Sequence, residues 1–155
     1  MSELHQIADL SEIKEGSKAY KRLQKLRRFI AEIEKHPVPE EISELINQQI
    51  DVLNAHHGTQ NQVGKAILRC QRKLLDLAVR KLKLTPRNYH RNVWTGLGMA
   101  VFGVPLGISF GLSMQNMGLL GIGIPVGLVI GIALGAAMDR KAKERGNQLD
   151  VDMIY

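Results

Sequence analysis

The sequence predicts an all-α membrane protein, in which an N-terminal cytoplasmic helical bundle or coiled coil precedes a two-helix glycine-zipper transmembrane hairpin. Three observations predict this fold. Residues 93–138 contain no charged or histidine side chain, glycines recur at regular steps within them, and apolar residues follow helical periods before them. The 21 Lys and Arg and the 15 Asp and Glu all lie outside residues 93–138. The mean hydropathy of −0.10 is therefore an average over unlike parts, which argues against one uniform soluble domain.

The N-terminal part, residues 1–86, is expected to form a cytoplasmic helical domain with helices at about 9–35, 39–57 and 60–84. Apolar residues step by three and four along each of these segments, as on one face of a helix. The first helix should stop at His36-Pro37-Val38-Pro39, and the second should have Pro39 in its first turn. Thr59 is expected as the N-cap of the third helix, which Thr85-Pro86 breaks. The connections are short, so an antiparallel bundle or coiled coil follows.

Residues 93–138 are too long for one membrane span. At about 1.5 Å per residue they would reach roughly 69 Å, more than twice the ~30 Å hydrocarbon core. Two spans, 93–114 and 118–138, fit if the chain turns at the polar and flexible residues Ser113, Gln115, Asn116 and Gly118. The sequence therefore predicts a helical hairpin.

Glycines recur every four residues in both spans. The residues expected to pack helices together, or to mediate oligomerisation, are Gly103, Gly107, Gly111, Gly123, Gly127, Gly131 and Gly135. A four-residue step keeps them on nearly one helical face, where backbones can approach closely. The pattern does not say whether the two glycine faces meet each other or a second copy.

Two prolines lie within the spans at matching places. Residues 102–112 align without a gap with residues 122–132, so Pro105 corresponds to Pro125. Each proline removes a backbone hydrogen bond and is a candidate helix kink. Pro105 is expected to bend the first helix, whereas Pro125 lies close enough to the turn for little disruption. The repeat resembles the inverted repeats of transporters in miniature, although a common packing solution explains it more simply.

Basic residues flank the hairpin on both sides. Residues 87–92 read as a basic juxtamembrane linker and residues 139–155 as a polar cytoplasmic tail. The residues expected at the membrane surface are Arg80, Lys81, Lys83, Arg87, Arg91, Trp94, Arg140 and Lys141. The turn between the spans carries no positive charge, so both termini of a multi-pass protein in an inner or plasma membrane should face the cytoplasm. Anionic lipid headgroups are the expected partners of these cations; no nucleic-acid motif accompanies them, so nucleic acid is not expected.

The sequence offers no catalytic, cofactor-binding or metal-binding constellation. His56 and His57 are adjacent, so they would point about 100° apart on a helix and make a poor ligand pair; a helix C-terminus is the simpler interpretation. Cys70, the single cysteine, lies on the apolar stripe of the third helix and is expected in the core. Neither catalytic residues nor a cofactor is expected, and an enzyme at the membrane surface has least support.

Two functions remain. The first is a membrane-anchored structural or adaptor subunit, which forms a homo-oligomer or a larger membrane complex through its hairpin and cytoplasmic helical domain. The alternative is a homo-oligomeric channel, transporter or membrane-permeabilising effector with glycine faces between subunits. The lack of intramembrane charge weighs against this alternative, although a hydrophobic gate is compatible with it.

Overall fold

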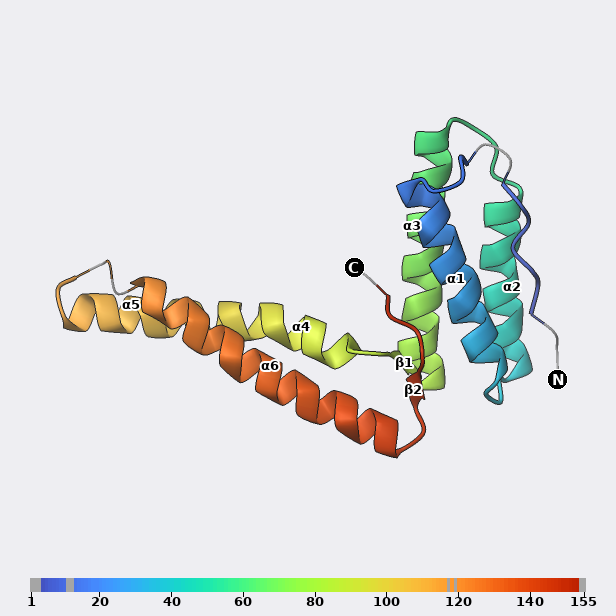
Figure 1. Ribbon diagram of the computed structural model, residues 1–155. Coiled ribbons are helices and arrows are strands. Elements are labelled where there is room, and N and C mark those ends of the chain that lie inside the picture. Colours follow the sequence, from blue (N-terminus) through green and yellow to red (C-terminus); the bar gives the residue numbers. More distant parts are fainter. Residues whose placement is uncertain (1–3, 11–12, 117, 119, 154–155) are drawn as a thin grey trace. The chain divides into compact units, whose positions relative to one another are not determined.

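The structure is a computed structural model that describes residues 4–10, 13–116, 118 and 120–153. The chain divides into two compact units (Figure 1). The helical unit comprises Met1–Thr85 together with Leu149–Tyr155, and the hairpin unit comprises Pro86–Gln148. The predicted helical domain, residues 1–86, ends close to the observed limit. The prediction did not include the return of the chain to this unit at Leu149.

Helix α1 (Lys18–Glu34) begins nine residues later than the predicted start at residue 9. Ser17 is its N-cap, and the Ser17 Oγ accepts a hydrogen bond of 3.1 Å from the Tyr20 backbone N–H. Gly16, just before the cap, has a φ of +78°, a left-handed conformation that interrupts any helix entering from upstream. Part of the predicted extension, residues 11–12, lies outside the described residues. The predicted apolar stripe is buried, including Leu26 and Ile33 with no exposed surface.

Helices α2 (Glu40–Asn54) and α3 (Gln60–Leu77) lie close to their predicted positions. Pro39 is the N-cap of α2, and Thr59 is confirmed as the N-cap of α3. A capping box joins Thr59 to Gln62, whose side-chain oxygen accepts from the Thr59 backbone N–H at 2.9 Å. A π-helical turn η1 (Ala78–Leu82) continues α3 and ends at Lys83, which has a φ of +58°.

The segment of residues 4–10 is extended, not the beginning of a helix. Its buried side chains are Leu4, Ile7 and Leu10. Helix α2 holds the backbone of this segment through two side chains. Asn47 accepts from the His5 N–H at 2.7 Å, and Asn54 accepts from the Ala8 N–H at 2.9 Å and donates to the Gln6 carbonyl at 3.0 Å. Arg27 of α1 donates to the Ile7 and Ala8 carbonyls. These side chains replace the backbone hydrogen bonds that a helix would have supplied.

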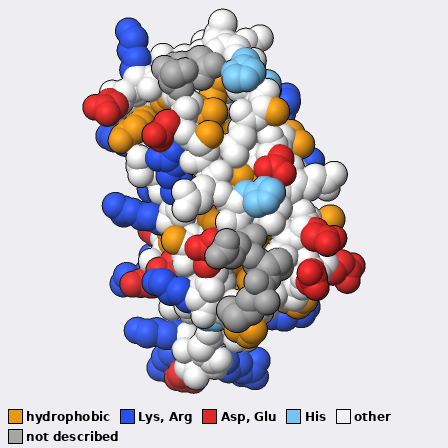
Figure 2. Space-filling view, turned by 90° about the vertical axis from the view of Figure 1, so that its right-hand side faces the viewer, with side chains coloured by type: hydrophobic (Ala, Val, Ile, Leu, Met, Phe, Trp, Pro, Cys, Tyr) orange, Lys and Arg blue, Asp and Glu red, His pale blue; other side chains and the backbone are white. Residues whose placement is uncertain are grey.

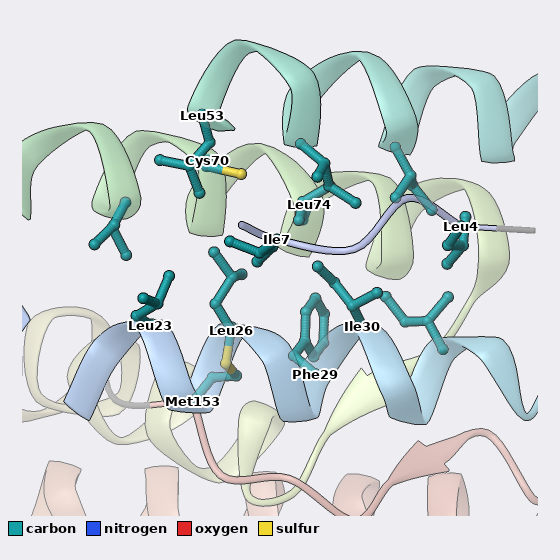
Figure 3. Close-up of a cluster of buried hydrophobic side chains, with 14 of the residues drawn as sticks. Leu4, Ile7, Leu23, Leu26, Phe29, Ile30, Leu53, Cys70, Leu74 and Met153 are labelled. Atoms are coloured by element: carbon teal, nitrogen blue, oxygen red, sulfur yellow. The ribbon is translucent and has the colours of Figure 1, made fainter. Parts of the chain in front are cut away.

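The C-terminal residues form part of the helical unit's core rather than a polar tail. Strand β1 (Thr85–Pro86) pairs with β2 (Gln148–Leu149). Apolar side chains then alternate with aspartates, and those that are buried are Leu149, Val151 and Met153. Met153 lies in the same cluster as Leu26 and Phe29 (Figure 3). The alternation places one face of the short segment in the core, which the polar composition of residues 139–155 concealed.

Leu149→Ala should destabilise the helical unit by about 3 kcal/mol, because its fully buried side chain would leave a cavity in the core. Asp152→Asn, which changes an exposed neighbour, should shift the free energy of unfolding by less than about 0.5 kcal/mol. Urea unfolding of the full chain in mild detergent, followed by circular dichroism, measures both. Equal stability of the two variants would contradict the assignment of residues 149–153 to this core.

The hairpin unit consists of two long helical stretches that run back along each other (Figure 1). The first stretch comprises α4 (Tyr89–Gly98), a π-helical turn η2 (Met99–Gly103) and α5 (Val104–Ser113). The second is α6 (Leu120–Glu144). Residues 89–92, predicted as a linker, are helical, and α6 continues six residues past the predicted limit at 138. Residues 117 and 119, at the predicted turn, lie outside the described residues.

Candidate membrane-spanning hairpin

The outer surface of the hairpin is apolar. The helices Tyr89–Ser113 and Gly121–Glu144 are long and apolar enough to cross a membrane, and the 18-residue apolar windows within them have mean hydropathies of 1.6 and 2.1. Only 22% of either apolar window is buried. Leu45 and Val52 are the only large apolar side chains that are exposed outside residues 93–138, within the part of the chain that the structure describes. The described part of the fold therefore leaves most of the apolar surface of these two helices uncovered.

The inner face of α6 is a stripe of buried residues at every fourth position. Its members are Gly123, Gly127, Gly131, Gly135 and Asp139. A Cβ atom placed at Gly127 would lie 2.6 Å from both the Gly103 Cα and the Gly98 carbonyl oxygen. A Cβ atom at Gly135 would lie 2.7 Å from the His90 carbonyl oxygen. The obstructing atoms belong to backbone, which cannot swing aside, so these positions have no room for a side chain.

The opposing face of the first stretch presents glycine from Gly98 onward and the backbone of Arg91 opposite Gly135, and its register changes at the π-helical turn. Gly103, Gly107 and Gly111 are buried at four-residue steps, and Gly98 precedes Gly103 by five residues. The Val104 N–H donates to the Met99 carbonyl, five residues back, which is the hydrogen bond of a π turn. The extra residue returns Gly98 to the face that Gly103 occupies. A Cβ atom at Gly98 would lie 2.5 Å from the Gly127 carbonyl oxygen.

The structure thus brings the two predicted glycine faces together within one chain. All seven predicted packing glycines are buried, and Gly123 faces Gly107 while Gly127 faces Gly103. Sequence reasoning missed Gly98, because a strict four-residue step excludes it. The sequence does carry a signal for Gly98: it is a small residue five positions before Gly103, and Pro105 follows two positions after Gly103, where a helix is often irregular. Gly96 and Gly121 lie off the interface, since a Cβ atom at either would meet nothing within 4 Å.

The two prolines occupy different local settings. Pro105 lies in the first turn of α5, directly after η2. A proline ring collides with the carbonyl four residues back in a regular helix, and the π turn changes the backbone path at that place. Pro125 lies inside α6, which continues without interruption from Leu120. The helix irregularity predicted at Pro105 is therefore a π turn on its N-terminal side.

Asp139 occupies the step after Gly135 on the inner face of α6, and it caps the first helix. Its Oδ1 accepts a hydrogen bond of 2.9 Å from the His90 backbone N–H, and its Oδ2 accepts one of 3.0 Å from the Arg91 N–H. The N-cap residue of α4, Asn88, makes no capping hydrogen bond with its side chain. A buried carboxylate from one helix therefore satisfies the first turn of the other, where the helix dipole favours negative charge.

The cationic residues of this unit gather at the open end of the hairpin. Arg87, Arg91 and Trp94 lie at the beginning of the first stretch, and Arg140 and Lys141 lie near the end of the second. The four basic side chains are exposed and Trp94 is half-buried. Arg140 pairs with Glu144 at 3.7 Å, an exposed contact of little energetic weight. The other predicted surface cations, Arg80, Lys81 and Lys83, are exposed residues of the helical unit, where Arg80 pairs with Asp76.

Cys70 is buried in the helical unit, as predicted. Its Sγ lies 3.6 Å from the Gln49 carbonyl, and 5% of the residue is exposed. Burial raises the pKa of the Cys70 thiol to about 11, and the charge of Lys73 opposes this only in part. His56 and His57 follow the end of α2. Within the described ranges, no cluster of three or more His, Cys, Asp or Glu side chains could hold a metal ion.

Cys70 should react very slowly with a thiol reagent at pH 8, where about one thiol in a thousand is ionised if its pKa is about 11. Folding keeps the proton on the thiol, so stability should fall as the pH rises from about 9 to 11, by up to roughly 2 kcal/mol. Cys70→Ala should lack this part of the pH dependence. Rapid labelling of the native chain at pH 8, or an identical pH profile for both chains, would contradict the buried thiol.

Comparison with known proteins finds no match: no protein-family model, no curated protein and no solved structure is similar to this chain.

Proposed function

We propose that this protein is a membrane-anchored structural or adaptor subunit. The hairpin anchors the chain in a lipid bilayer, and the helical unit presents an interaction surface at the cytoplasmic face. The observation that carries the proposal is the inside-out arrangement of the hairpin, with glycine at the helix interface and large apolar side chains outside. In water this arrangement would expose large apolar side chains to solvent, which is unfavourable. In a lipid bilayer the same side chains contact hydrocarbon, which is favourable.

The lengths of the apolar parts support a spanning hairpin over a buried core hairpin. The apolar part of α6, residues 120–138, would extend about 28 Å at 1.5 Å per residue, close to the ~30 Å hydrocarbon core. A core helix of a soluble protein would bury most of its apolar window, but 22% of this one is buried. The glycine faces act as a glycine zipper that closes the hairpin by backbone contact and dispersion.

The basic open end supports an orientation with both termini in the cytoplasm. Arg87 and Arg91 precede the first span, and Arg140 and Lys141 follow the second. The described residues of the opposite end, including Gln115 and Asn116, carry no charge. By the positive-inside rule the open end remains on the cytoplasmic side, where its cations also meet anionic headgroups.

The channel or transporter alternative receives less support. It was motivated by glycine faces that could join subunits, and these faces lie between two helices of one chain. The spans also contain no charged side chain that could bind an ion or relay a proton.

Cysteine accessibility in intact cells tests insertion and orientation together. In a Cys70→Ala background, Asn116→Cys should react with a membrane-impermeant maleimide from outside, and Lys143→Cys should react only after permeabilisation. The protein should also resist extraction by alkaline carbonate. Carbonate-soluble protein, or labelling of both cysteines from the same side, would refute the anchored hairpin.

A further inference from the structure

An exposed apolar stripe crosses the outer face of α2. Leu45 is 37% exposed and Val52 is 64% exposed, and they lie seven residues apart, on one face of the helix. No other large apolar side chain outside the hairpin is exposed among the described residues. Seven-residue spacing is also the repeat by which two parallel helices keep a common seam.

The two flanks of this stripe carry opposite charges. On the α3 side, a groove of about 440 Å³ is bordered by Val52, Arg69 and Arg72, and an adjoining groove by Leu45 and Arg72. The one acidic residue of the adjoining groove, Asp76, is paired with Arg80. On the other side, a shallow hollow is bordered by Val52, Glu44 and Asp51. Figure 2 shows a group of acidic side chains on the right-hand part of the face that it presents, and further acidic side chains among Lys and Arg on its left-hand part. The order across the face is therefore basic, apolar, acidic.

We propose that this face of α2, with its flanks, pairs with the same face of a second copy of the chain. A two-fold axis parallel to α2 places two α2 helices side by side in parallel. This operation exchanges left and right, so each basic flank meets the acidic flank of the second copy. Arg72 then lies opposite Glu44 of the other copy, and the Leu45 and Val52 stripes meet at the seam.

The alternative two-fold arrangement is disfavoured by the same charges. An axis perpendicular to the helices would make them antiparallel and would set basic against basic and acidic against acidic. The charges thus select the parallel dimer, and the apolar stripe stabilises it. The inference rests on the proposed function in one respect. Anchoring confines the chains to one membrane and raises their effective concentration, so the short contact through Leu45 and Val52 is enough for dimerisation.

Charge reversal of the full chain tests the pairing, with the chain reconstituted in lipid vesicles so that the copies stay confined to one membrane. Arg72→Glu alone and Glu44→Arg alone should each weaken the dimer at least about tenfold, because every dimer contains the contact twice. An equimolar mixture of the two variants should recover dimers, since each altered flank then meets a complementary one. Native mass spectrometry distinguishes these mixed dimers by mass. Neither substitution alters a buried residue, so both variants should remain folded.

Cross-linking locates the seam. Val52→Cys should form disulfide-linked dimers under mild oxidation, because residue 52 meets its own counterpart at the two-fold axis. Arg28→Cys, exposed on α1, serves as the control and should not. The proposal is overturned if the Val52 cross-link does not form or if the mixture does not recover dimers. It is also overturned if the chain is strictly monomeric and this face binds only an acidic helix of another protein. Dimers that persist in a chain whose hairpin does not insert would instead refute the anchor alone.

Discussion

Gly127→Leu should separate the two helices of the hairpin and destabilise it by at least about 3 kcal/mol. Any Cβ atom at residue 127 would lie 2.6 Å from the Cα of Gly103 and from the carbonyl oxygen of Gly98. Both obstacles are backbone atoms of a helix, so relief requires the helices to part. Parting the helices loses the dispersion contacts along the whole glycine face. The variant should still insert into membranes, because leucine is more apolar than glycine.

The matched control is Gly121→Leu on the same helix. A Cβ atom at residue 121 would meet nothing within 4 Å, so this variant adds the same side chain without obstruction. Trp94 is the chain's only tryptophan, and its backbone contacts Gly131, so its fluorescence reports the state of the hairpin. Unfolding by SDS in mixed micelles should be much easier for Gly127→Leu and nearly unchanged for Gly121→Leu. Equal sensitivity of the two variants would show that the glycine face does not hold the hairpin together.

Asp139→Ala should destabilise the hairpin by about 2 kcal/mol, because two backbone N–H groups lose their charged partner at the partly buried start of α4. Asp139→Asn should have a smaller effect, since its amide retains one acceptor oxygen for the two donors. The loss of stability should be greatest at the open end of the hairpin, where Asp139 contacts α4. Amide hydrogen exchange at His90 and Arg91 should therefore accelerate more than exchange in the middle of the spans.

Glu144→Gln is the control for the charge change. Glu144 is exposed near the end of the same helix, and its pairing with Arg140 contributes little, so its loss should have an effect below about 0.5 kcal/mol. The SDS titration used for the glycine variants measures all three chains. If Asp139→Ala and Glu144→Gln behave alike, the carboxylate contributes surface charge and does not cap α4.

The helices were predictable from the sequence where one simple period operates. Apolar steps of three and four located α2 and α3 closely, and four-residue glycine steps identified the inner face of α6. The first hairpin helix mixes a five-residue step with four-residue steps, because a π turn lies between Gly98 and Gly103. No fixed period describes such a helix, and Gly98 was missed for this reason. Asp139 was missed because its role depends on the N–H groups of a helix about 50 residues earlier.

The two extended segments of the helical unit were less predictable. Leu4, Ile7 and Leu10 recur every third residue, a spacing compatible with both a helix and an extended chain. Their conformation is decided by Asn54 and Arg27, which lie far away in the sequence. The C-terminal Leu149, Val151 and Met153 alternate with polar residues over too short a stretch to outweigh a charged neighbourhood. Both segments acquire their structure from tertiary contacts.

The central claim is that the hairpin turns glycine inward and large apolar side chains outward into lipid. Spin labels on single cysteines along α6, in a Cys70→Ala background in liposomes, test it most directly. At Val129, Ile132 and Leu134 the claim predicts high collision rates with oxygen and low rates with a water-soluble nickel complex. A label at Gly121 should be nearer to water than these three. High nickel-complex accessibility at Val129 would contradict a lipid-facing surface.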